Sequence, residues 1–333
     1  MVMSFMMMMI ILSLITLFSP SFWSVWVGME VMNFVFIPFM MFYQNKSMKS
    51  KGFIYLIVGS LSSSLFLLSS FMLNIDSMFI LLVAVSMLLK LGAFPFHSWM
   101  ISISENLDYD VLYIMLTIMK LVPLFILMSL NFLPYMLLIM ILGLMISLGG
   151  LGSNSIRVVL TYSSISHTSW ILMTSMFSEW FMLIYVMIYF SVFYYFIKIC
   201  KIYNLMKMSN LISWFSKNPL MVFLTASISG MPPFLMFFPK LLCLLGMMKV
   251  GLVFEALMCL ILSSIPLYFY LKMFLLSFLS ESHSSECFFI NKNIKFNSAY
   301  SLVSLIMINF TLLILLIYGL KEKIPPMFNW LMH

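Results

Sequence analysis

The sequence predicts an all-α membrane protein with many spans. Of its 333 residues, 64% are hydrophobic and only 8% are charged, a composition that a water-soluble domain could not carry on its surface. The apolar residues fall into runs of about 20, the length that one helix needs to cross a bilayer. Two of these runs are interrupted by glycine and proline and carry a lysine, a pattern typical of transporters built from internal repeats.

The apolar runs divide the chain into about eleven spans. We expect them at residues 3–18, 22–42, 52–73, 77–99, 111–129, 133–151, 156–177, 179–202, 219–248, 250–279 and 299–319. The first run has no basic residues before it and no small-residue cleavage site, so we expect a retained span and not a signal peptide. The loops between the spans are too short for a soluble domain, and residues 1–333 are therefore predicted to form a single membrane domain.

Basic loop residues predict the orientation. With an odd number of spans the two termini lie on opposite faces, and the loops on the N-terminal face carry nine basic residues against three on the other. The nine are Lys46, Lys49, Lys51, Arg157, Lys201, Lys207, Lys217, Lys292 and Lys295, and the three are Lys249, Lys321 and Lys323. By the positive-inside rule, the N-terminus lies in the compartment where the protein is made.

Two broken segments share the pattern Gly-x-x-Pro-Phe, which begins at Gly92 and again at Gly230. Glycine and proline weaken and break helices. The run 219–248 is also too long for one straight span. We therefore expect two half-helices there, joined by an unwound turn that is buried in protein or lines a wet cavity.

Four ionisable residues lie deep in the predicted spans, and these are Glu30, Lys90, Lys120 and Lys240. A charged residue at the centre of a span costs about 2.5–3.5 kcal/mol on insertion scales, so its default interpretation is functional. The alternatives are a protonated glutamic acid in a helix–helix hydrogen bond, or lysines that extend to the interface. The lysines lie too near the centres of their predicted spans to reach the membrane interface easily.

His167 is a further candidate, because histidine changes its charge near neutral pH. Its neighbours Ser163, Ser164, Ser166 and Thr168 carry hydroxyls that could order water. A histidine that only joins two helices explains the same residue equally well.

Buried amines and a carboxylate can load and release protons. Burial favours the neutral form of an amine, whereas a nearby carboxylate favours the charged form. Making or breaking a Glu–Lys pair changes this balance by an amount comparable with the roughly 2.3 kcal/mol that moves one charge across 100 mV. The sequence has no flavin, iron–sulfur or nucleotide motif, and its four cysteines lack metal-ligand spacing. We therefore expect no bound cofactor and no metal in this chain.

Five stretches carry a resemblance to the antiporter-like membrane subunits of respiratory complex I. They are WVGMEVMNF with Glu30, LLKLGAFPFHSW with Lys90, MKLVP with Lys120, IRVVLTYSSISHTSW with His167, and SGMPPFLMFFPK with Lys240. They occur in the family's order, and the resemblance extends over essentially the whole chain.

The resemblance implies two inverted five-helix repeats, each with a broken helix. On this chain they would be about 3–129 and 133–279, followed by a closing helix at 299–319. It also implies that Glu30, Lys90, Lys120 and Lys240 form a proton-transfer axis, with His167 as a relay. NADH, FMN, iron–sulfur clusters and ubiquinone would lie in other subunits of the complex, and the neighbouring membrane-arm subunits and lipids would be the partners. The location would be the mitochondrial inner membrane, with the N-terminus in the matrix and the C-terminus in the intermembrane space.

Two other functions are compatible with the same residues. A freestanding cation/proton antiporter would bind its cation through carboxylates and carbonyls, but Glu30 is the only acid deep in a predicted span. A non-pumping spacer of the membrane arm would use its lysines only to hold partner helices. Alanine substitution of Lys90 or Lys240 separates these cases, because a spacer would retain proton pumping.

Overall fold

The computed structural model describes residues 2–42, 49–73, 79–130, 133–210, 219–232 and 234–281, and every regular element among them is helical. The chain forms two compact units, one that extends to Met176 and one that begins at Phe177. The predicted all-α class is therefore confirmed for the described residues.

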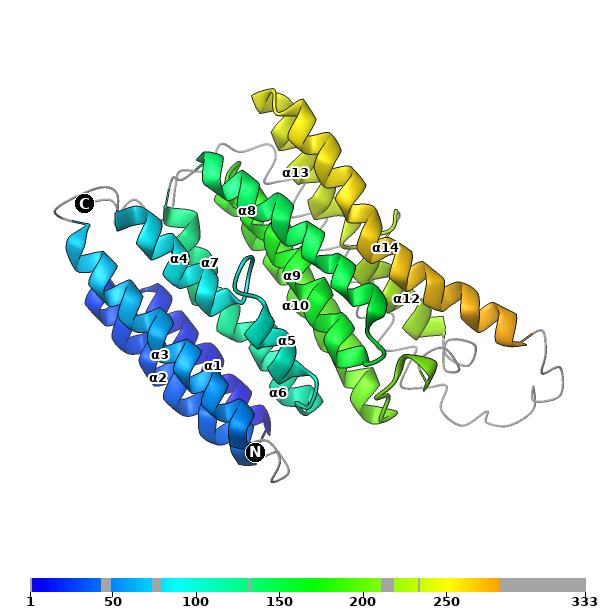
Figure 1. Cartoon of the computed structure of the whole chain (residues 1–333), viewed down its shortest axis with the longest axis horizontal. Coiled ribbons are helices and arrows are strands. Elements are labelled where there is room, and N and C mark those ends of the chain that lie inside the picture. Colours follow the sequence, from blue (N-terminus) through cyan, green and yellow to red (C-terminus); the bar gives the residue numbers. More distant parts are fainter. Residues whose placement is uncertain are drawn as a thin grey trace. The chain divides into compact units, whose positions relative to one another are not determined.

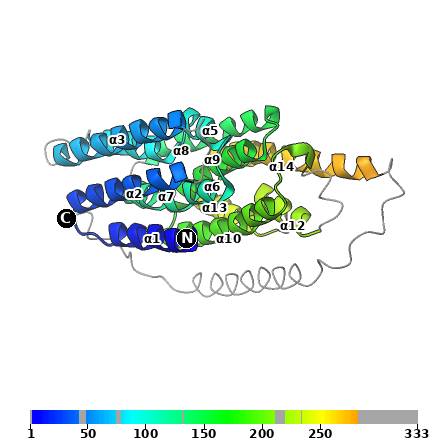
Figure 2. The ribbon, with the colours of Figure 1, turned by 90° about the horizontal axis from the view of Figure 1, so that it is seen from below.

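The first unit contains nine α-helices and one 3₁₀ segment among its described residues. Its helices are α1 (Val2–Leu17), α2 (Phe22–Phe42), α3 (Lys49–Met72), α4 (Phe79–Leu91), α5 (Ser98–Ser104), α6 (Tyr109–Leu116), α7 (Ile118–Ser129), α8 (Leu133–Ile146) and α9 (Ile156–Ser175), with η2 (Ser147–Gly152) between the last two. Helix α2 packs between α1 and α3, as Figure 2 shows. Helix α3 packs in turn on α4, and α7 lies against α1, α4 and α9.

The second unit is built from α10 (Glu179–Ile202), α12 (Pro219–Ser229), α13 (Phe237–Val250) and α14 (Val253–Glu281). The long helix α14 runs along both α12 and α13 (Figure 1). Helix α10 packs on the same two short helices.

Five helical stretches in the described residues are long and apolar enough to cross a membrane, and one of them comprises α6 and α7 together. They are Phe22–Met41, Lys51–Met72, Tyr109–Ser129, Glu179–Ile202 and Val253–Lys272. Their outward side chains are largely apolar, as a lipid-facing surface requires. The full set of eleven spans stays a prediction, and the expected closing helix at 299–319 lies outside the described residues.

Both predicted breaks are confirmed. The first apolar run ends as a helix at Leu91 and resumes at Ser98, and the second divides into α12 and α13. At each break a glycine takes the left-handed conformation, with φ of +59° at Gly92 and +75° at Gly230, which costs glycine little and other residues more. Pro233 of the second break lies outside the described residues.

One further interruption was not predicted. The span expected at 111–129 divides at Thr117, whose φ of −121° and ψ of −78° are not helical. The Thr117 hydroxyl donates a 2.6 Å hydrogen bond to the carbonyl of Tyr113. Such a bond from a threonine to its own helix competes with the regular ladder and often bends it.

Candidate functional site

The break after α4 places Lys90 one residue before the end of a helix. Gly92 N–H donates to Leu89 O at 3.2 Å, and this carbonyl also accepts a 3.1 Å hydrogen bond from the indole of Trp99. The terminal carbonyl is thus satisfied by a side chain from beyond the break, as helix ends require. These two bonds close the turn that directly follows Lys90.

The Lys90 amine lies inside the protein. Its Nζ is buried and has no hydrogen-bond partner among the described residues. An amine in this position is expensive to keep charged unless water or another polar group reaches it, so Lys90 is suited to a change of protonation state.

Glu30 is half-buried on α2 and is held from α3. The hydroxyl of Ser63 donates a hydrogen bond to Glu30 Oε1. One helical turn further along α2, Asn33 Oδ1 accepts a 3.2 Å hydrogen bond from the hydroxyl of Tyr55, which also lies on α3. Helices α2 and α3 therefore meet along a polar seam formed by Glu30, Asn33, Tyr55 and Ser63.

Lys120 is the most buried of the predicted lysines, with 2% of its surface exposed. It lies on α7, and its amine donates a 3.2 Å hydrogen bond to the hydroxyl of Ser164 on α9. The Ser164 hydroxyl in turn donates to the backbone carbonyl of Thr161 at 2.7 Å. Lys120 thus joins two helices and has a neutral partner, so its charge is not cancelled there by a carboxylate.

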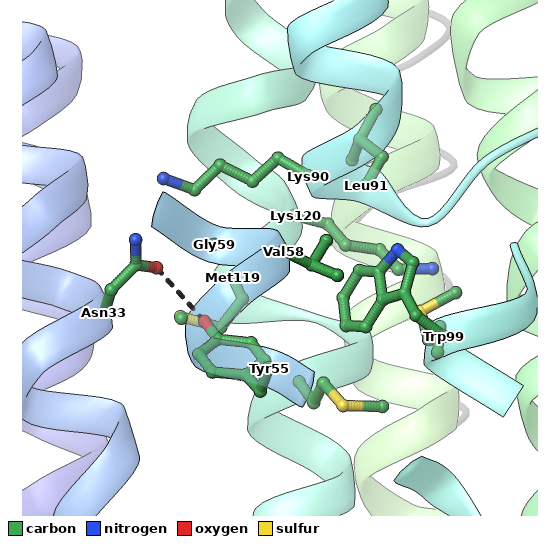
Figure 3. Close-up of a pocket in the computed structure, with 11 residues that line it drawn as sticks. Asn33, Tyr55, Val58, Gly59, Lys90, Leu91, Trp99, Met119 and Lys120 are labelled. Carbon is green, nitrogen blue, oxygen red and sulfur yellow. Dashed lines mark hydrogen bonds between the residues drawn. The ribbon is translucent and has the colours of Figure 1, made fainter. Parts of the chain in front are cut away.

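A small cavity lies between Lys90 and Lys120. It has about 20 Å³ of space for the centre of a water molecule, and its wall also includes Asn33, Tyr55 and Trp99. Figure 3 shows the two amines extended toward opposite sides, Lys90 toward α2 and Lys120 away from it. The structure therefore brings the first two predicted lysines to one cavity in the first unit.

His167 is 1% exposed on α9, three residues after Ser164. This spacing puts it on the same side of the helix as the Lys120 contact. The neighbouring hydroxyls of Ser163, Ser166 and Thr168 each donate to a carbonyl of their own helix. Since these hydroxyls already donate to the backbone, they could order a water molecule only by accepting a hydrogen bond from it.

Lys240 belongs to the second unit and is 6% exposed. Its amine donates a 3.3 Å hydrogen bond to the carbonyl of Ser229, the last residue of α12. The carbonyl end of a helix is electronegative and favours a cation. A side chain at Gly230 would overlap the Lys240 amine, so the glycine of the break also makes room for the lysine.

The residues that the sequence did not single out are Asn33, Tyr55, Ser63 and Gly59. Asn33 follows Glu30 by three residues, a spacing that places both on one face of α2, and this signal was available. The α3 residues Tyr55, Gly59 and Ser63 follow each other at intervals of four. Their contacts with residues of α2 could not be predicted from the sequence, because these contacts depend on how the two helices pack.

Comparison with known proteins gives one family match and many relatives. Residues 73–266 match the family model described as NADH:quinone oxidoreductase/Mrp antiporter, TM. The NADH-ubiquinone oxidoreductase chain 2 of Rhipicephalus sanguineus is 37% identical over 311 residues, which cover 91% of this chain and 95% of that protein. The chain 2 protein of Artemia franciscana is 32% identical, with 80% and 88% covered.

Solved structures share the fold at low identity. A chain of respiratory complex I from Thermus thermophilus with bound aureothin has a TM-score of 0.70 and 16% identity, with 89% of this chain and 73% of that chain covered. A chain of the Mrp complex from Dietzia sp. DQ12-45-1b has a TM-score of 0.72 and 16% identity, with 79% and 57% covered.

Proposed function

This chain belongs to the NADH-ubiquinone oxidoreductase chain 2 family, and on that premise we propose that it moves protons across the mitochondrial inner membrane through side chains held within its spans. It is an antiporter-like membrane subunit, and NADH oxidation and ubiquinone reduction would take place elsewhere in the complex. The proposed proton carriers are Glu30, Lys90, Lys120, Lys240 and His167.

The observation that carries the proposal is the burial of the amines. Lys120 and Lys240 are 2% and 6% exposed, and the Lys90 Nζ is buried as well. Their hydrogen bonds to Ser164 and to the Ser229 carbonyl are to neutral groups. Burying an ammonium ion costs several kcal/mol, and an amine that binds and releases a proton avoids part of that cost.

The wider layout belongs to the same proposal. The inverted repeats at about 3–129 and 133–279, the set of eleven spans, and the closing helix at 299–319 would give one membrane domain. The N-terminus would face the matrix and the C-terminus the intermembrane space, as the basic loop residues suggest. Partners would be the neighbouring antiporter-like subunits and lipids, and this chain would bind no cofactor of its own.

Substitution of Glu30 tests the proposal. Glu30→Gln keeps the shape and the acceptor for the Ser63 hydroxyl but removes the titratable carboxylate, so we expect NADH oxidation and proton pumping to slow together in an assembled complex. Glu179→Gln is the control, because Glu179 lies at the first residue of α10 and outside the seam. If Glu30→Gln left pumping unchanged, Glu30 would not be a carrier, and loss of assembly would make it structural.

A native gel after mild detergent extraction distinguishes this function from a freestanding antiporter. We expect the chain to migrate within a large complex that oxidises NADH. Migration alone or as a homodimer would contradict the proposal.

A further inference from the structure

The amide of Asn33 has an unused donor inside the protein. Asn33 is 5% exposed, and its Oδ1 accepts the hydroxyl of Tyr55 at 3.2 Å. Its Nδ2 is buried and has no hydrogen-bond partner among the described residues. Because an unmet buried donor is costly, this nitrogen points to a ligand that accepts hydrogen bonds.

The structure around Asn33 holds its amide in place. Tyr55 is itself 5% exposed and fixes the oxygen side of the amide. On the nitrogen side, a Cβ at Gly59 would lie 3.3 Å from Asn33 Nδ2, so the asparagine packs closely against the backbone of α3. The orientation of the unused donor is therefore set by two contacts from one helix.

The same cavity contains a second unused donor. Asn33, Tyr55, Lys90 and Lys120 all contribute to its wall, and the buried Lys90 Nζ also lacks a hydrogen-bond partner in the described part of the chain. The volume of about 20 Å³ for a water centre exceeds the roughly 10–15 Å³ that one ordered water needs. A buried water typically has two to four polar partners, and the unused donors of Asn33 and Lys90 supply two.

We propose that this cavity binds a single water between the Asn33 amide and the Lys90 amine, and that Asn33, oriented by Tyr55, is a positioning residue for proton transfer between Lys90 and Lys120. The inference rests on the proposed proton-pumping function and assigns a new role within it. Asn33 itself does not change its protonation state.

The transfer balances in protons and charge. An N–H bond of the Lys90 ammonium breaks as its proton forms an O–H bond with the water, and another O–H bond of that water breaks as its proton joins the neutral Lys120 amine. Lys90 ends neutral, Lys120 ends charged, and the water is regenerated. The two amines extend to opposite sides of the cavity (Figure 3), so Lys120 accepts the proton after its side chain turns from Ser164 toward the cavity that it lines.

Two substitutions in the assembled complex test this role. Asn33→Leu removes the Nδ2 donor with little change in side-chain volume. Tyr55→Phe removes the hydroxyl that orients the Asn33 amide and leaves the Nδ2 donor in place. We expect each to slow NADH-driven proton pumping, Asn33→Leu by about tenfold, as the loss of one good hydrogen bond allows. The rate in D₂O should fall further than in the unaltered complex, because proton transfer becomes limiting. A merely structural role would not move this isotope effect.

Ser62→Ala is the matched control. Ser62 is fully buried on α3, but its hydroxyl donates to the Gly59 carbonyl of its own helix at 2.8 Å, so its loss should leave pumping and the isotope effect unchanged. If Asn33→Leu prevents assembly, Tyr55→Phe decides the question with the same two readouts.

The outcomes separate the inference from the function on which it rests. Normal pumping and an unchanged isotope effect in the Asn33 variant, together with lost pumping in Lys120→Ala, would overturn the inference and leave the function standing. Normal pumping in both would overturn both. A high-resolution map should also show one ordered water within hydrogen-bond distance of Asn33 Nδ2 and Lys90 Nζ, and a dry cavity would contradict the inference.

Discussion

The glycine of the second break provides a test that alters no charged or polar group. Gly230 has a φ of +75°, and a Cβ at this position would overlap the Lys240 amine. Gly230→Ala therefore has two effects. It imposes the backbone cost of a left-handed non-glycine residue, about 1–2 kcal/mol, and it displaces Lys240 from the carbonyl of Ser229.

The chain contains a matched control for the first effect. Gly251, at the end of α13, has a φ of +87°, and no atom lies within 4 Å of the position that its Cβ would take. Gly251→Ala should thus carry the same backbone cost without moving an amine. The difference between the two variants isolates the displacement of Lys240.

The expected difference follows from the 3.3 Å hydrogen bond between Lys240 Nζ and Ser229 O. Hydrogen bonds that involve a charged group are worth about 1.5–3 kcal/mol, and this amount corresponds to about tenfold to hundredfold in rate if it is carried into the proton-transfer step. The assay is the rate of NADH-driven proton pumping in membrane vesicles, alongside the thermal stability of the complex. Equal pumping by Gly230→Ala and Gly251→Ala would refute the role assigned to Lys240.

Two further substitutions address the hydroxyl partners. Ser63→Ala removes the donor to Glu30 and should slow pumping by up to about tenfold. The control is Ser64→Ala, which loses only an exposed hydrogen bond to its own helix and should leave the pumping rate unchanged. Equal pumping rates for the two variants would contradict the role of the seam. Ser164→Ala removes the hydroxyl that accepts the 3.2 Å hydrogen bond from Lys120. It should slow pumping without lowering the amount of assembled complex, which a native gel measures. An unchanged pumping rate would mean that this bond does not position the amine.

The sequence was sufficient for the all-α class and for both predicted breaks within the described residues. Runs of about 20 apolar residues define spans because a bilayer fixes their length, and the glycine–proline pairs at Gly92 and Gly230 interrupt them for local steric reasons. The break at Thr117 was missed, because a threonine hydroxyl that bonds to the preceding turn can either bend its helix or leave it regular, as Thr168 does in α9. That choice depends on packing around the helix and not on the residue type.

The site was predictable in part. The cost of burial singled out Lys120 and Lys240, and the structure places both amines inside the protein. The partner of Lys120 could not be predicted, since Ser164 is 44 residues away and meets it only through the packing of α7 on α9. Asn33 was overlooked because an uncharged amide carries a weaker sequence signal than a buried charge.

The number of protons pumped per NADH oxidised by a complex that carries Lys120→Ala is the most direct test of the claim that buried amines conduct protons in this subunit. Lys198→Ala is the comparison, because Lys198 is an exposed lysine on α10. We predict a clear fall in the ratio, or loss of coupled turnover, for Lys120→Ala and an unchanged ratio for Lys198→Ala. An unaltered ratio in an assembled Lys120→Ala complex would contradict the account.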